Sequence, residues 1–86
     1  MTHEQMREWI VAFLAELLDV APHEIDPELP LDQLGFDSAT TLDLCGRLEE
    51  ELGIDTTPKA IADHPTADAL AAHLVARPAV LGRQSP

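Results

Sequence analysis

Apolar residues in the first part of the chain recur at steps of three and four, the spacing of one face of an α-helix. Thr2 and Gln5 precede most of this stripe with the spacing of a capping box, in which two side chains satisfy free N–H groups at a helix start. We therefore predict a first helix over about residues 3–19, with one broad face buried in a core. Its apolar positions are Met6, Trp9, Ile10, Phe13, Leu14, Leu17 and Leu18.

The helical pattern breaks between Val20 and Asp37, where three prolines remove backbone donors and disfavour helix at the residues before them. Apolar residues nevertheless continue through this stretch, so we expect a long connection pinned over the core rather than a disordered linker. A connection of this length is uncommon in a small domain and usually has a function. Its apolar anchors are Ile25, Leu29, Leu31 and Leu34.

A second, acidic helix is predicted over about residues 38–52, because the helical periodicity resumes there. Gly53 stands just past its end, where a left-handed C-cap is expected. One face carries the apolar repeat and is expected to point into the core, with Leu44 beside it. The repeat consists of Leu42, Cys45, Leu48 and Leu52.

Two shorter helices follow. Thr57 and Pro58 read as the N-cap and first residue of a third helix over about residues 58–64, which Pro65 ends. Thr66 can cap a fourth helix, and Pro78 stops it. The buried positions expected on the fourth helix are Ala67, Leu70, Ala71, Leu74 and Val75.

These elements predict an all-α fold: a small four-helix bundle with a long loop between helices one and two and a short helix three. We assign residues 1–76 to one domain and residues 77–86, which lack periodicity, to a flexible C-terminal tail. With one Trp and two Phe in 86 residues, the core must be built mainly from aliphatic side chains, which favours packed helices over a β-sandwich.

Acidic residues outnumber basic ones 16 to 5, a formal charge of −11. Such a surface repels nucleic acid and anionic membranes and speeds association with basic partners, although acidity can also serve solubility alone. The single cysteine, Cys45, excludes an intrachain disulfide and is expected to be a small buried hydrophobe. No secretory signal or membrane-length apolar run is present, so we expect a cytoplasmic protein. We also expect it to be a monomer.

The most suggestive stretch joins the proline-rich connection to the second helix. Gly35 permits a sharp turn, and Phe36 is expected to bury its ring and fix where that turn lies. Asp37 and Ser38 are both good N-cap residues. A hydroxyl here lies beside unpaired backbone N–H groups and the positive end of a helix dipole, which favours a phosphate. Ser38 is therefore a candidate for covalent attachment, with simple helix capping as the alternative.

No convincing catalytic or metal-binding set is found in the sequence. The histidines, His3, His23, His64 and His73, are scattered and lack ligand spacing. His64 is expected to cap a helix end, and His73 to lie on the exposed side of helix four. The acidic stretch over residues 26–37 lacks the ligand alternation and central glycine of a calcium loop. We therefore predict a protein that is not an enzyme and has no metal site.

The segment Leu34-Gly35-Phe36-Asp37-Ser38 resembles the attachment signature of the acyl carrier protein family, the phosphopantetheine-bearing modules of fatty acid and polyketide synthesis. A second segment, His64-Pro65-Thr66 with Ala69-Leu70-Ala71-Ala72-His73-Leu74, is similar to the end of carrier domains in polyketide synthases. The resemblance covers about residues 3–76.

The resemblance implies that Ser38 receives 4′-phosphopantetheine from coenzyme A, in a magnesium-dependent reaction run by a phosphopantetheinyl transferase. It implies that Asp37 helps the transferase recognise the carrier. Asp43, Glu49 and Glu50 match acidic positions that meet basic patches on partner enzymes such as ketosynthases and acyltransferases. The thiol of the arm would hold acyl intermediates as thioesters.

Two positions depart from the family pattern. Ala39 follows the serine where Leu or Met is usual, and Thr40 replaces a frequent acidic residue. A peptidyl or aminoacyl carrier of nonribosomal peptide synthesis remains an alternative, although Phe36 argues against its usual signature. An alternative from another class is an acidic helical interaction module without a prosthetic group.

Overall fold

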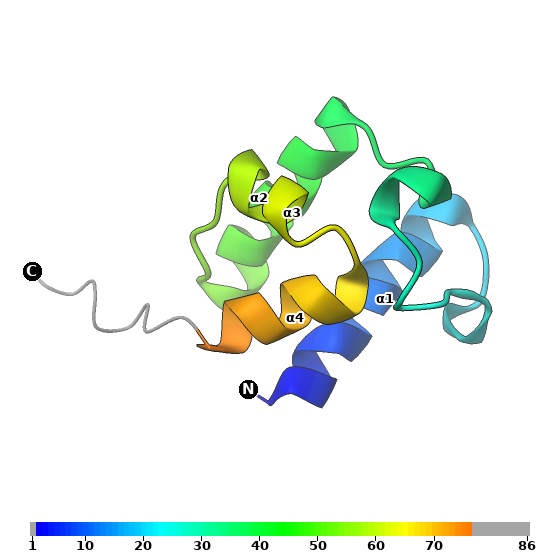
Figure 1. Ribbon diagram of the computed structural model, residues 1–86, viewed down its shortest axis with the longest axis horizontal. Helices are drawn as coiled ribbons and strands as arrows, with labels where there is room; N and C mark the ends of the chain where they lie inside the picture. The colour runs from blue at the N-terminus through cyan, green and yellow to red at the C-terminus, as the bar shows by residue number, and fades with distance from the viewer. Residues whose placement is uncertain (1, 77–86) are drawn as a thin grey trace, which may run out of the picture.

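The computed structural model describes residues 2–76, and the predicted tail over residues 77–86 lies outside the described residues. The described chain is all-α, as predicted, with four α-helices and two short 3₁₀ turns (Figure 1). The helices are α1 (His3–Leu18), α2 (Ser38–Leu52), α3 (Pro58–Asp63) and α4 (Ala67–Ala76), and the 3₁₀ turns are η1 (Pro22–Glu24) and η2 (Leu31–Leu34).

The predicted caps determine where the helices begin and end. Thr2 and Gln5 form the capping box of α1, with hydrogen bonds of 2.9 and 3.1 Å. Thr57 accepts from the Ala60 N–H at the start of α3, and Gly53 ends α2 in the left-handed conformation at φ 68°. The predicted bounds of α1 and α2 agree with the structure within one residue.

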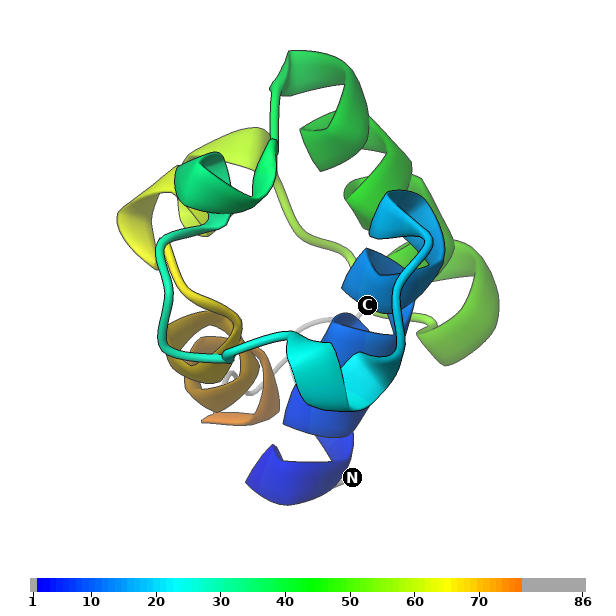
Figure 2. The ribbon, with the colours of Figure 1, turned by 90° about the vertical axis from the view of Figure 1, so that its right-hand side faces the viewer.

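The core lies between α1, α4 and the inner face of α2. α1 packs most extensively against α4, and the two helices lie side by side in Figures 1 and 2. Polar contacts join α1 to α2: Trp9 Nε1 donates to Glu51 at 3.3 Å, and Arg47 donates to Glu16 at 3.1 Å. Since the later residue of α1 meets the earlier residue of α2, these two helices run in opposite directions.

The connection between α1 and α2 is anchored to the junction between α3 and α4. The Leu31 N–H donates to the Pro65 carbonyl at 2.7 Å, and the Asp68 N–H donates to the Pro27 carbonyl at 2.9 Å. Pro30 and Thr66 form an isolated antiparallel bridge between these bonds. The connection and the α3–α4 junction therefore support one another, and the predicted pinning of the loop is confirmed at Ile25 and Leu31, which are 6% and 4% exposed.

Three leucines that the sequence predicts to be buried are exposed in the structure. Leu42 is 61% exposed, because the face of α2 that meets the bundle is centred on Leu44 and Leu48, both fully buried. Leu17 and Leu29 are also exposed, at 41% and 37%, since each lies at the margin of the elements that cover the core. The described helices include none long and apolar enough to cross a membrane.

Candidate functional site

Gly35 forms the turn that the sequence predicts before α2. It ends η2 in the left-handed conformation, at φ 86° and ψ 17°, where a side chain would be strained. The Phe36 N–H then donates to the Leu31 carbonyl at 3.2 Å, which closes the turn. The chain therefore leaves η2 and enters α2 with a change of direction set by Gly35.

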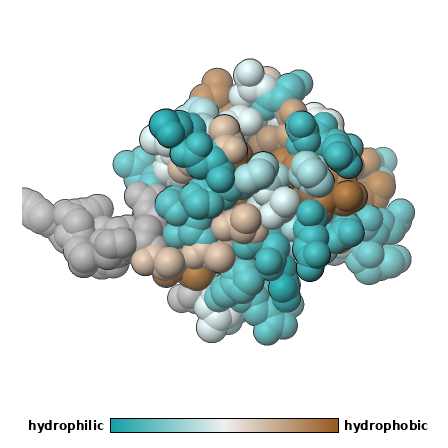
Figure 3. All heavy atoms as spheres, viewed as in Figure 1, coloured by the Kyte–Doolittle hydropathy of each residue, from teal (hydrophilic) through white to brown (hydrophobic). Residues whose placement is uncertain are grey.

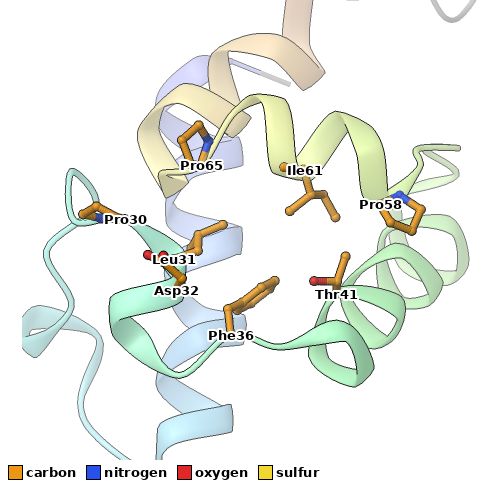
Figure 4. A pocket seen from close by; sticks show the side chains of 9 residues that line it. Pro30, Leu31, Asp32, Phe36, Thr41, Pro58, Ile61 and Pro65 are labelled. Atoms are coloured by element: carbon orange, nitrogen blue, oxygen red, sulfur yellow. The ribbon is translucent and has the colours of Figure 1, made fainter.

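Phe36 is half-buried and packs against the margin of the core, a weaker burial than the sequence suggested. Its ring points into a pocket of about 360 Å³ between η2, α2 and α3, towards Thr41 and Ile61 (Figure 4). A second depression of about 510 Å³ adjoins it and includes Ser38, Leu42 and Pro58. Phe36, Thr41 and Pro58 border both hollows, so a largely apolar groove leads from Ser38 towards α3.

Asp37 is the N-cap of α2, and Ser38 is the first residue of the helix. The Asp37 carboxylate accepts the Thr40 N–H and the Thr40 hydroxyl, each at 2.9 Å. Hydrogen bonds from the Thr40 backbone and then from its hydroxyl lower the pKa of Asp37, so the carboxylate is ionised at neutral pH. The Thr41 hydroxyl donates to the Asp37 carbonyl at 2.9 Å and secures the same turn.

Ser38 is exposed at the amino end of α2, while Asp37 performs the capping that the sequence left open between the two residues. Because Asp37 caps the helix, the Ser38 hydroxyl is available for other chemistry. Because the first N–H groups of a helix lack partners within the helix and carry its positive dipole end, a negatively charged group on Ser38 is favoured.

The acidic candidates Asp43, Glu49 and Glu50 are all exposed on α2. Only Arg47 adds a positive charge to this helix, and it is held by Glu16 and Glu51 at 3.1 and 3.2 Å. Arg47 also lies over the Phe13 ring, 5.5 Å from its centroid. The outer surface of α2 therefore presents carboxylates without a competing free cation among the described residues.

The other polar candidates have structural surroundings. His64 and His73 stack with ring centroids 4.1 Å apart, so His73 is half-buried between α3 and α4 and not on an exposed side as predicted. The backbone N–H of His64 donates to the Ala60 and Ile61 carbonyls at the end of α3. Residues 2–76 contain no group of three or more His, Cys, Asp or Glu side chains arranged to hold a metal ion.

Cys45 is a free, half-buried thiol on α2. Burial, and next the negative charge of Asp55, raise the pKa of the Cys45 thiol, so it is protonated at neutral pH.

The sequence did not identify three further residues that line the pocket beside Phe36: Thr41, Pro58 and Ile61. They come together with Phe36 only through the packing of α3 on α2.

Hydropathy over one face of the molecule is consistent with this layout. In Figure 3 most atoms are hydrophilic, and hydrophobic side chains gather between α2 and the α1–α2 connection.

Comparison with known proteins identifies relatives over most of the chain. The model of the family described as "Phosphopantetheine attachment site" matches residues 8–74. One of the phenolphthiocerol/phthiocerol polyketide synthase subunits of Mycobacterium tuberculosis is 39% identical over 71 residues, which are 83% of this chain and 4% of that protein. Polyketide synthase PksN of Bacillus subtilis is 34% identical over 71 residues, 83% of this chain and 1% of that protein. The chain thus spans only a small part of these curated relatives.

Solved structures share the fold. A free-standing peptidyl carrier protein from Acinetobacter baumannii superposes with a TM-score of 0.78 at 32% identity, covering 85% of this chain and 91% of that chain. Asl1650, an acyl carrier protein from Anabaena with a variant phosphopantetheinylation-site sequence, gives a TM-score of 0.78 at 37% identity, covering 85% and 83%.

Proposed function

Because this chain belongs to the phosphopantetheine attachment-site family, we propose that Ser38 is its attachment residue and that the protein carries acyl or polyketide intermediates. Members of this family attach a 4′-phosphopantetheine group, and such carrier domains of polyketide synthases work with synthase enzymes. When bound, the group supplies a terminal thiol that holds a substrate as a thioester. Carriers of this kind are typically not catalysts themselves.

The observation that carries the proposal is the exposed Ser38 hydroxyl beside an ionised Asp37 cap at the start of α2. The residues present fit the group. An exposed hydroxyl can accept a phosphodiester without displacing any packed side chain, and the helix end favours its negative charge. The groove bordered by Phe36, Thr41 and Pro58 offers apolar surface next to the attachment atom.

In the proposed transfer of phosphopantetheine from coenzyme A to the protein, Ser38 Oγ would form a bond to the phosphorus that carries the pantetheine. The pyrophosphate bond would break, adenosine 3′,5′-bisphosphate would leave, and the hydroxyl proton would pass to a base of the transferase. The raised pKa of Cys45 supports the idea that the chain itself offers no competing thiolate.

We further propose that four acidic residues guide partner enzymes to Ser38. They are Asp37, Asp43, Glu49 and Glu50. Asp37 is held beside Ser38 by Thr40, where a transferase could recognise it. The other three carboxylates are exposed along α2 and suit basic patches on a ketosynthase or acyltransferase. Contacts of this kind are screened by salt, which permits quick exchange among several enzymes.

The attachment can be tested by intact mass measurement after incubation with coenzyme A, magnesium and a promiscuous phosphopantetheinyl transferase. We expect wild type to gain one phosphopantetheine group and Ser38→Ala to gain none. Ser85 is the only other serine in the chain and gives a matched control, since Ser85→Ala should be modified as fully as wild type. An unmodified wild type, or a modified Ser38→Ala, would contradict the proposal.

A peptidyl or aminoacyl carrier is the second candidate, favoured by the likeness to the Acinetobacter peptidyl carrier protein. The two are distinguished by loading the phosphopantetheinylated protein. A malonyl-coenzyme A acyltransferase should charge an acyl carrier, whereas adenylation domains with ATP and amino acids should charge a peptidyl carrier.

A further inference from the structure

The pocket between η2, α2 and α3 has one charged side chain in its lining, Asp32. The other lining residues are apolar except for Thr41, and the hollow of about 360 Å³ has a size usual for sites that bind small molecules. Asp32 is exposed on η2, and its carboxylate makes no hydrogen bond or ion pair with another described residue. This carboxylate is therefore available to a molecule that enters the pocket.

The pocket continues into the depression that contains Ser38, because both are lined by Phe36, Thr41 and Pro58. Asp37 is the charged residue in the lining of the Ser38 depression. In the described part of the chain, every charged side chain that lines the path from Ser38 into the pocket is thus a carboxylate. A ligand on this path meets negative charge at both of its ends.

Hydrogen-bond donors in the pocket lining are largely used within the fold. The Leu31 N–H donates to the Pro65 carbonyl at 2.7 Å, and the Thr41 hydroxyl donates to the Asp37 carbonyl at 2.9 Å. The Asp32 carboxylate adds hydrogen-bond acceptors only. The pocket therefore suits a ligand that brings its own donor, such as a hydroxyl group. Three of the lining residues are prolines, which have no backbone N–H: Pro30, Pro58 and Pro65.

Asp32 lies on the inner part of this path. It lines the pocket but not the Ser38 depression, so a chain that starts at Ser38 passes Phe36 and Thr41 before it reaches Asp32. Figure 4 shows Asp32 on the η2 side of the pocket and Thr41 on the α2 side, with the Phe36 ring and Ile61 between them. An entering chain therefore meets apolar walls first and a carboxylate afterwards.

We propose that Asp32 determines which acyl groups enter this pocket: it admits chains that carry a hydroxyl group and excludes chains that end in a free carboxylate. The proposal rests on the attachment of phosphopantetheine at Ser38, and it adds a substrate class to the carrier function. A hydroxyl group donates to the Asp32 carboxylate. A malonyl group instead brings a negative charge towards Asp37 and Asp32, so it stays in solvent.

The test measures how fast hydroxylamine cleaves the thioester on the full-length carrier, relative to the same acyl-coenzyme A. A promiscuous transferase installs butyryl, 3-hydroxybutyryl and malonyl groups on Ser38 from their coenzyme A thioesters. Because a chain in the pocket withdraws its thioester from solvent, 3-hydroxybutyryl should be protected most and malonyl least. Two unit charges about 4 Å apart in water change an equilibrium by about fivefold, so Asp32→Asn should increase malonyl protection by up to about that factor. Asp32→Leu should also remove the advantage of 3-hydroxybutyryl over butyryl.

Glu28→Gln is the matched control, because Glu28 is an exposed acid on the same connection, outside the pocket lining. It should leave all three relative rates unchanged. About 1 M NaCl should increase malonyl protection in wild type, since salt screens exposed charges, and this measurement needs no variant. A wild-type carrier that is not modified would overturn the attachment and the Asp32 proposal together. A modified wild type with equal relative rates for butyryl and malonyl, or an Asp32→Asn variant that matches wild type, would overturn the Asp32 proposal alone.

Discussion

The Asp37 carboxylate accepts two hydrogen bonds from Thr40, one from the backbone N–H and one from the hydroxyl, each 2.9 Å long. An acidic side chain at position 40 would instead bring a second negative charge towards this cap. The threonine that departs from the family pattern therefore supports the residue next to Ser38, and the Asp37–Thr40 pair keeps the capping function away from the serine.

This pair predicts a pH dependence of stability. The hydrogen bonds lower the pKa of Asp37 in the folded state below its ordinary value of 3.8. The ionised cap therefore stabilises the fold above that value, and the contribution is lost as pH falls through the lower folded-state value. Asparagine also caps helices but does not titrate. Wild type should exceed Asp37→Asn in stability by a constant margin above about pH 5, and the margin should shrink at lower pH.

Urea denaturation of both proteins at a series of pH values would measure this margin. Thr40→Val serves as a second check, because it removes the hydroxyl bond and should move the pKa of Asp37, followed by NMR, towards its ordinary value. A margin that does not change with pH would contradict the assigned role of the charge.

The orientation of α2 predicts a strong contrast between two leucines. Leu44 is fully buried, so Leu44→Ala should cost about 2–5 kcal/mol of unfolding free energy through lost burial and a cavity. Leu42 is largely exposed, so Leu42→Ala should change stability by less than about 0.5 kcal/mol. Chemical denaturation of both variants measures the difference, and equal losses would mean that α2 presents another face to the core.

The link between α1 and α2 through Arg47 should be salt-dependent. Arg47 bonds Glu16 and Glu51 and covers the Phe13 ring. Arg47→Met keeps an apolar stem and removes the charge, so it should lower the melting temperature by a few degrees at low salt. Salt screens exposed ion pairs, and at 1 M NaCl the Debye length falls to roughly 3 Å. The difference in melting temperature between Arg47→Met and wild type should therefore shrink at this salt concentration. A difference that salt leaves unchanged would indicate that Arg47 acts mainly through packing.

The proposed role of Asp43 predicts a loss of partner turnover without a loss of fold. Asp43→Lys places a positive charge on the exposed surface of α2 and should slow acyl transfer to the loaded carrier by an acyltransferase with a basic docking patch. Glu8→Lys makes the same charge change on α1 and should leave transfer unchanged. Circular dichroism of both variants should match wild type, and equal transfer rates in the two would argue against docking through Asp43.

The ends of the helices could be predicted from the sequence because single residues determine them. Thr2, Gly53 and Thr57 each satisfy or release particular backbone groups, and their chemistry is local. The turn at Gly35 was predictable for the same reason, since few other residues adopt φ 86° without strain.

The inner face of α2 could not be predicted in this way. Apolar residues occur around most of the helix, so periodicity allowed a stripe through Leu42 as readily as one through Leu44. Which stripe is buried depends on the orientation in which α2 packs on the other helices. The α1–α2 connection sets this orientation through tertiary contacts. The pairing of His64 with His73, and of Phe36 with Ile61, likewise depends on the packing of separate helices.

The bonds that tie Leu31 to Pro65 and Pro27 to Asp68 have a consequence for the order of folding. During synthesis, Ser38 leaves the ribosome before the α3–α4 junction does. The α1–α2 connection, which precedes Ser38, packs against that junction. Closing that long loop costs entropy that only the late contacts return. The serine and its cap are therefore present early, but the proposed attachment site becomes rigid only once α4 has docked against the loop that precedes it.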